Sequence, residues 1–177
     1  ITGADPVRAA LTAQYDALTY LKEETLKAVN RHEDIEDIVN EVHLTYDLIG
    51  PYTREFVGSE AFVVRQVYAD YMGWFDGDVA HLESLSQREE DVRLMELGGG
   101  ENPTLNYVKK CLTEHTRSGA IAALDYLGPL RRVYPSAQAE AYYIQALKML
   151  AWTTPSAELR NYYLSEACAV AGGCVTP

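Results

Sequence analysis

The sequence predicts an all-α fold, an antiparallel stack of helices. Several segments longer than ten residues repeat apolar side chains with the 3.6-residue period of a helix face. Proline and glycine separate these segments where helices are expected to begin and end. The short apolar pairs Val63-Val64 and Ala169-Val170 are in phase with the helices. No segment therefore has the pattern of a strand.

Three helices are expected before residue 75. The first spans about residues 5–30, and Asp5-Pro6 is a typical helix start. A second covers about residues 33–48 and is broken by Gly50-Pro51, and a third covers residues 59–74. The apolar positions of the first helix recur close to a 3.6-residue period, and they are Leu11, Tyr15, Leu18, Leu21, Leu26 and Val29.

The third helix is followed by a glycine-flanked turn, Gly73-Trp74-Phe75-Asp76-Gly77. The two glycines free the backbone, and the Asp76 carboxylate is suited to accept a hydrogen bond from the chain in an Asx-type turn. Two interpretations of Trp74 follow. It is either a core residue at a helix end, or part of a surface that docks on a second subunit or on a neighbouring domain.

A second half begins at a run of three glycines. Ser86 and Glu89 have the spacing of a capping box, and the helix that they open is expected to end at Gly98-Gly99-Gly100. Residues 1–177 are thus predicted to be one helical domain, divided into residues 1–97 and residues 101–177.

The second half contains helix pairs with a weak internal repeat. Breaks are expected at Gly119, Pro135-Ser136 and Thr154-Pro155. Four residues fall where a tetratricopeptide-like repeat places an aromatic, a small residue, a bulky apolar residue and a proline: Tyr107, Ala123, Leu127 and Pro135. Lys110-Cys111 stands where the repeat has Leu-Gly, and a generic antiparallel stack explains the pattern equally well.

The composition excludes some partners and favours others. The net charge is -11, which argues against nucleic acid and against anionic membrane surfaces. No apolar run approaches the roughly 20 residues that a membrane-spanning helix needs. Thirteen tyrosines are typical either of residues at the rim of a core or of subunit contacts.

No catalytic or metal site is predicted. The four histidines and three cysteines lack the spacing of zinc motifs, and they are His32, His43, His81, His115, Cys111, Cys168 and Cys174. The acidic run at residues 33–37 is expected to be a solvated helix face with first-turn acids, and Glu89-Glu90-Asp91 is expected to be a charged first turn. A further hypothesis is a small all-α enzyme that uses scattered carboxylates, but no feature of the sequence requires it.

Two segments resemble the dimerisation domain of bacterial alkyl sulfatases. The first is Tyr52-Thr53-Arg54-Glu55-Phe56-Val57-Gly58, where the family has Tyr-Thr-Arg-Gly-Tyr-Tyr-Gly. The second is residues 67–78, where the family has Val-Tyr-Gln-Arg-Tyr-Leu-Gly-Trp-Tyr-Asp-Gly-Asn. Residues 21–26 and 159–165 are also similar. The resemblance marks a candidate interface of Tyr52, Arg54, Gly58, Tyr68, Tyr71, Gly73, Trp74, Phe75, Asp76 and Gly77.

The resemblance implies a homodimerisation module with no catalytic centre of its own. In the family, such a module follows a metallo-β-lactamase-like domain that carries two zinc ions and hydrolyses sulfate esters. Zinc is therefore expected only in a neighbouring domain, and the partners are a second copy and that catalytic domain. Since the chain begins at Ile1, it is expected to be a fragment. A periplasmic or secreted parent is implied as well.

The chain also departs from the family pattern. Ala61-Phe62-Val63 stands for Ser-His-Asn, and Asp78-Val79 stands for Asn-Pro. These polar side chains of the family are therefore missing here. The alternative is a free-standing helical-repeat adaptor that binds a protein or peptide partner.

Overall fold

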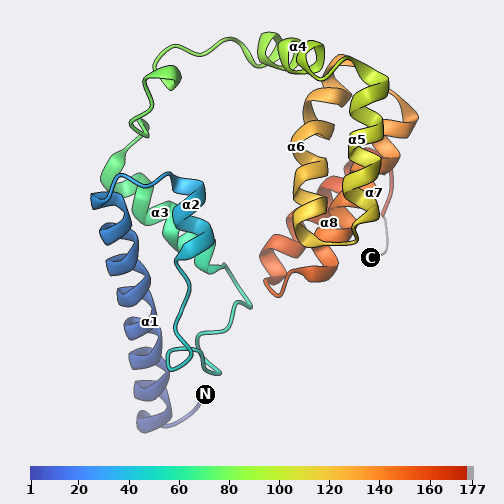
Figure 1. The fold of residues 1–177 in the computed structure, drawn as a ribbon. Helices are drawn as coiled ribbons and strands as arrows, with labels where there is room; N and C mark the ends of the chain where they lie inside the picture. Colours follow the sequence, from blue (N-terminus) through green and yellow to red (C-terminus); the bar gives the residue numbers. More distant parts are fainter. Residues whose placement is uncertain (175–177) are drawn as a thin grey trace. The chain divides into compact units, whose positions relative to one another are not determined.

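The computed structural model describes residues 1–174, and all regular secondary structure within them is helical (Figure 1). The prediction of an all-α chain is confirmed. The chain divides into two compact units, one from Ile1 to Glu83 and the other from Ser84 onward. The boundary lies before the helix that opens at Ser86, not at the three glycines.

Unit 1 holds α1 (Ala4–Asn30), α2 (Ile35–Glu41), α3 (Glu60–Met72) and the short 3-10 turn η1 (Val79–His81). Helix α3 runs in the same direction as α1. Its start lines a pocket with the middle of α1, and its end lines another with Val29. The core of the unit is formed by Ala17, Leu21, Ala28, Ile38, Val42, Leu44, Val64 and Tyr68.

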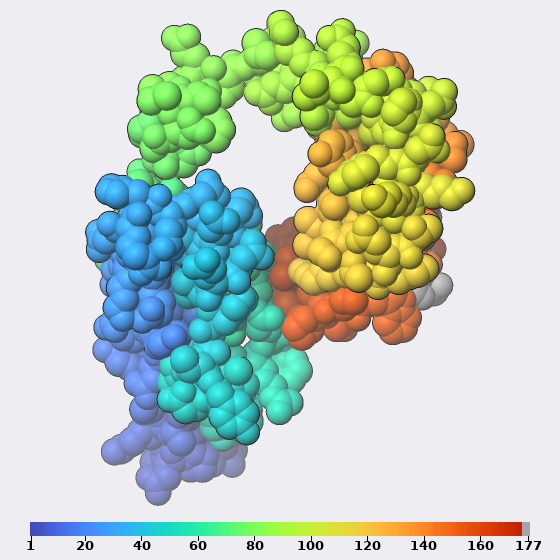
Figure 2. Space-filling model, viewed as in Figure 1, coloured from blue at the N-terminus to red at the C-terminus, as the bar shows by residue number. Residues whose placement is uncertain are grey.

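The buried face of α1 does not contain all of its periodic apolar positions. Leu11 and Tyr15 are 66% and 70% exposed and lie outside the core. Helices α2 and α3 cover only the later part of α1, and no residue from Ala4 to Asp16 is buried. In the space-filling view, the start of α1 (dark blue) projects beyond the rest of unit 1 (Figure 2). Small residues such as Ala17 and Ala28 are buried instead, because they let α3 approach.

Helix α2 is shorter than the predicted span of residues 33–48. It starts with the Asp34 carboxylate accepting a hydrogen bond from the Glu36 N–H at 2.7 Å, and it ends at Val42, whose backbone is extended. Val42 and Leu44 are both buried. The chain after α2 thus fills the core in an extended conformation, which a helical apolar period does not reveal.

Unit 2 consists of α4 (Gln87–Leu97), α5 (Glu101–Thr113), α6 (Arg117–Val133), α7 (Ala137–Thr153) and α8 (Ala157–Ala171). Hydroxyl side chains cap the starts of α4, α6, α7 and α8, as expected at such breaks. Its core contains Met95, Leu105, Val108, Cys111, Leu112, Ala123, Leu127, Leu130, Ala139 and Ala146.

The helices α6, α7 and α8 pack antiparallel in sequence order. Arg117 at the start of α6 donates to the Thr154 hydroxyl beyond the end of α7, at 2.9 Å. Tyr143 in the first half of α7 donates to Glu166 near the end of α8, at 3.3 Å. The helix pairs of the prediction are therefore present, while the tetratricopeptide-like register stays a prediction.

Gly119 does not mark a turn, as the sequence suggested, but lies in the first turn of α6. The Thr116 hydroxyl caps this helix by accepting a hydrogen bond from the Gly119 N–H at 3.0 Å. A Cβ atom on Gly119 would stand 2.4 Å from the carbonyl oxygen of Cys111 in α5. Glycine is therefore needed here for the close approach of two helices.

One acid of the predicted charged turn at residues 89–91 is buried. Asp91 is 2% exposed and accepts two hydrogen bonds from the Arg132 guanidinium, at 2.5 and 2.9 Å, and a third from Gln87 at 3.1 Å. The Arg132 hydrogen bond, chiefly, lowers the pKa of Asp91 against the opposing effect of burial. This pair ties α4 to the end of α6, so α4 belongs to unit 2.

Candidate functional site

The ten candidate interface residues form two clusters at opposite ends of α3. Tyr52, Arg54 and Gly58 precede the helix, whereas the other seven lie in its last turns or beyond them. A helix of this length is about 20 Å long. The structure therefore does not gather the ten residues into one site.

The first cluster lies in a loop held against α1. The Gln14 side-chain amide donates to the backbone carbonyl of Tyr52. The Thr53 hydroxyl donates to the Leu48 carbonyl at 2.7 Å and accepts from the Gly50 N–H at 2.8 Å. These bonds shape the turn after Gly50, because they satisfy backbone groups that no helix pairs.

The same loop also caps α3. Glu55 accepts a hydrogen bond from the Glu60 N–H at 2.7 Å, and Ser59 accepts one from the Phe62 N–H at 3.2 Å. Gly58 adopts a positive φ of 75°, which favours glycine. The family-like segment thus fixes where α3 begins.

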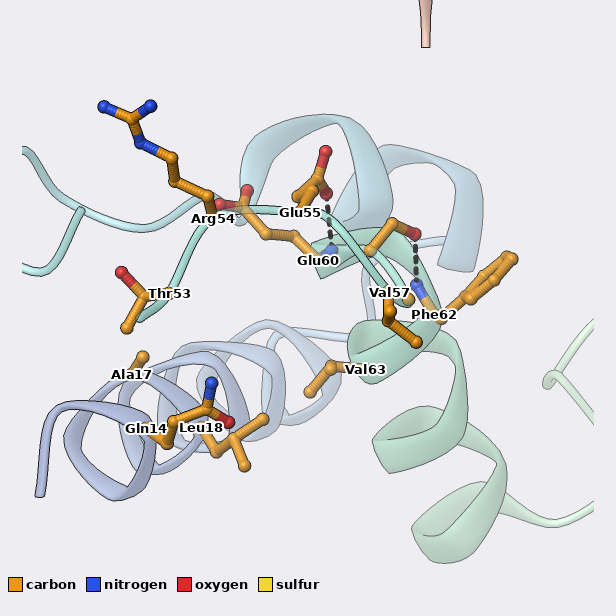
Figure 3. Close-up of a pocket in the computed structure, with 12 residues that line it drawn as sticks. Gln14, Ala17, Leu18, Thr53, Arg54, Glu55, Val57, Glu60, Phe62 and Val63 are labelled. Atoms are coloured by element: carbon orange, nitrogen blue, oxygen red, sulfur yellow. Dashed lines mark hydrogen bonds between the residues drawn. The ribbon is translucent and has the colours of Figure 1, made fainter. Parts of the chain in front are cut away.

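A pocket of about 170 Å³ lies between α1, this loop and the start of α3 (Figure 3). Its apolar lining includes Leu18, Val57 and Val63. Arg54 also borders it, but its guanidinium points away from α1 and toward solvent (Figure 3). Phe62 stands where the family has histidine. The pocket combines an apolar wall with a polar rim.

The second cluster begins where α3 ends. Gly73 has a positive φ of 74°, and its N–H donates to the Ala69 carbonyl at 2.9 Å. The Asp76 carboxylate accepts a hydrogen bond from the Asp78 N–H at 3.0 Å, and Gly77 between them has a φ of 95°. The glycine-flanked Asx turn predicted here is confirmed.

His81, which is not among the ten candidate interface residues, completes this turn. The second carboxylate oxygen of Asp76 lies 2.5 Å from His81 Nδ1. The pKa of Asp76 is lowered by the hydrogen bond from the Asp78 N–H and then by the one to His81, and Asp76 in turn raises the pKa of His81. The Tyr68 hydroxyl donates to the Asp76 carbonyl at 3.4 Å. The signal available in the sequence was Asp78, whose side chain caps the short turn that carries His81.

Two aromatic residues of the cluster, Tyr71 and Trp74, face solvent, whereas Tyr68 lies in the core of unit 1. Trp74 is 81% exposed and its ring centroid lies 5.7 Å from that of Phe75, so the interpretation of Trp74 as a core residue is wrong. Tyr71 is 57% exposed, and the Lys22 ammonium lies 5.9 Å from its ring centroid. The alternative, a contact surface, stays a prediction.

The described residues do not fit a zinc site. Within residues 1–174, no three His, Cys, Asp or Glu side chains stand close enough to hold a metal ion. His43 contacts the Glu60 carboxylate, and His81 contacts the Asp76 carboxylate. Over the same residues, no helix combines the length and the apolar character that crossing a membrane demands.

Comparison with known proteins identifies relatives across nearly the whole chain. Residues 34–173 match the family described as alkyl sulfatase dimerisation. A linear primary-alkylsulfatase of Pseudomonas sp. (strain ATCC 19151) is 27% identical over 174 residues, which are 97% of this chain and 33% of that protein. An (R)-specific secondary-alkylsulfatase of Pseudomonas sp. is 26% identical over 181 residues, covering 99% of this chain and 26% of the relative.

The fold agrees with the same relationship. The structure of the stereoselective inverting sec-alkylsulfatase Pisa1 from Pseudomonas sp. superposes with a TM-score of 0.89 at 27% identity. The match covers 99% of this chain and 28% of the Pisa1 chain. The chain therefore spans about a quarter to a third of the length of the relatives that it matches.

Proposed function

Because the chain belongs to the alkyl sulfatase dimerisation family, we propose that it is the homodimerisation module of a longer alkyl-sulfatase-like hydrolase. The family match over residues 34–173 carries this proposal. The exposed apolar side chains of unit 1 support it, since large exposed apolar patches mark interaction sites. The helices and their connecting loops provide the scaffold for that contact.

The catalytic centre belongs, in this proposal, to another part of the longer protein. The relatives carry the name of alkylsulfatases, and this chain corresponds to only 33% or less of the relatives described above. The parent would hydrolyse alkyl sulfate esters with zinc held in a neighbouring domain. A periplasmic or secreted location of the parent rests on the family resemblance alone.

Light scattering of the chain tests the self-association. At tens of micromolar, the expected mass is twice the 19.7 kDa of one chain. Serial dilution gives the dissociation constant, and a monomer mass at every concentration would contradict the proposal.

Assays of metal content and turnover test the proposal that the catalytic centre lies in another part of the longer protein. After extensive dialysis, elemental analysis of the chain should find no stoichiometric zinc, and a long-chain alkyl sulfate should release no sulfate. The longer gene product serves as the positive control. Stoichiometric zinc in this chain, or turnover by it, would place the catalytic centre here and refute the division of labour.

A further inference from the structure

An apolar stripe runs along the exposed start of α1. It consists of Val7, Leu11, Tyr15 and Leu18, which we name the α1 stripe. Their spacing places them on one face of the helix, and the first three form a row of residues four apart. Each is between 41% and 70% exposed. This row is a ridge of the kind that packs into the groove of another helix.

Unit 1 itself does not cover the stripe. The buried residues of α1 begin at Ala17, after the first three residues of the stripe. The apolar surface continues beyond the stripe, because Leu18 lines a pocket with Val57, which is exposed, and Lys22 lies over the exposed ring of Tyr71. The stripe is therefore one part of a longer apolar band on one unit.

We infer that the α1 stripe packs against the α1 stripe of a second copy of the chain, so that the two helices cross about a two-fold axis. This inference rests on the proposed homodimerisation and assigns its surface. A two-fold contact uses the same patch on both subunits, and an apolar ridge meets that requirement without charge complementarity.

The distribution of charge favours a second copy as the occupant. Residues 1–22 contain two acids, Asp5 and Asp16, and two bases, Arg8 and Lys22, so their net charge is zero. The whole chain carries -11, and the rest of the sequence therefore holds all of that excess. Two identical chains repel each other through their acidic surfaces. This electrostatic repulsion is smallest when the two chains meet through this neutral, apolar segment.

The area is consistent with this role. The four side chains expose on the order of 400 Å², which is within the range of the largest apolar patches on monomers. A stable dimer buries about 800 Å² per partner. The neighbouring exposed residues Phe56, Val57 and Tyr71 extend the patch toward that value.

Paired substitutions on two sides of α1 test the assignment. Leu11→Gln with Tyr15→Gln removes the centre of the stripe. Ala9→Gln with Thr12→Gln, the matched control, changes exposed residues of the same turns on a different side. We expect wild type and control to have equal dimer dissociation constants by sedimentation equilibrium. The dissociation constant of the stripe variant should be at least about a hundredfold higher. Circular dichroism should show the same helix content in all three.

The outcomes separate the two proposals. A stripe variant that dimerises like wild type overturns the surface assigned here and leaves the homodimer intact. A wild-type chain that is monomeric overturns the proposed function and this inference together. If the glutamine variant loses helix content, Leu11→Ala with Tyr15→Ala replaces it, because alanine is the strongest helix former, and the same comparison applies.

Discussion

Replacing Gly119 with alanine tests the close approach of α5 and α6. The new Cβ would stand 2.4 Å from the Cys111 carbonyl oxygen, which is backbone and has little freedom to move. Overpacking of this kind costs about 1–3 kcal/mol or more, and the gain in helix propensity from glycine to alanine offsets only about 0.5–1 kcal/mol. We expect Gly119→Ala to lower the free energy of unfolding of unit 2 by about 2 kcal/mol.

Gly128 in the same helix provides the matched control. A Cβ there meets only the end of the Arg132 side chain, at 3.5 Å, which is an ordinary contact. The propensity gain of Gly128→Ala is opposed by the proline that follows, because a residue with a Cβ before proline disfavours the helical conformation. The two effects should leave the unfolding free energy within about 1 kcal/mol of wild type.

Urea denaturation followed by circular dichroism measures both variants. For a unit of fewer than 100 residues, about 2 kcal/mol corresponds to roughly 8–16 °C in melting temperature, so a thermal scan gives an independent reading. Equal stability of Gly119→Ala and Gly128→Ala would refute the packing described for α5 and α6.

Three further predictions follow from the structure. Trp74→Ala should change the unfolding free energy of the monomer by less than about 0.5 kcal/mol in chemical denaturation, because the ring is exposed. A loss of about 3–5 kcal/mol would instead show that Trp74 is a core residue. Arg132→Met should destabilise unit 2 by about 3 kcal/mol, because it leaves the buried Asp91 carboxylate without its cation. Asp91→Asn should destabilise it by only about 1–2 kcal/mol, because the Arg132 side chain that loses its partner is half exposed to water. The lowered pKa of Asp91 makes this stabilisation present above about pH 4 and lost as the pH falls through the folded-state pKa, so an acid titration of wild type should show that loss and Asp91→Asn should not. The raised pKa of His81 adds stability below about pH 6.5, and this stability disappears as the pH rises through the folded-state pKa. NMR titration should find the pKa of His81 above its ordinary value in wild type and lower in Asp76→Asn. Identical pKa values in the two proteins would contradict the Asp76–His81 contact.

Local signals in the sequence predicted several helix ends, but not the end of α2 or the start of α6. Ser86 with Glu89 forms the capping box, Ser59 caps α3, and Gly73 ends it. Each of these features depends on residues within a few positions of one another, so the sequence alone contains the whole interaction. The Asx turn at Asp76 was predictable for the same reason.

Features that depend on distant partners were not predictable in this way. Helical periodicity shows that Leu11 and Tyr15 share a face with other apolar residues, but only the position of α3 decides that Ala17 and Ala28 are buried instead. Asp91 looks like a solvated acid until α6 brings Arg132 to it from 41 positions away. The motif residues were recognisable, yet their separation at two ends of α3 required the structure.

Hydrogen exchange as a function of protein concentration tests the central claim most directly. No residue from 4 to 16 is buried in one chain, so the amides of this segment should exchange rapidly in dilute solution. At concentrations where light scattering shows the dimer, we predict slower exchange over residues 4–18 and unchanged exchange in α6 and α7. A dimer whose α1 amides exchange as fast as those of the monomer would contradict self-association through the α1 stripe.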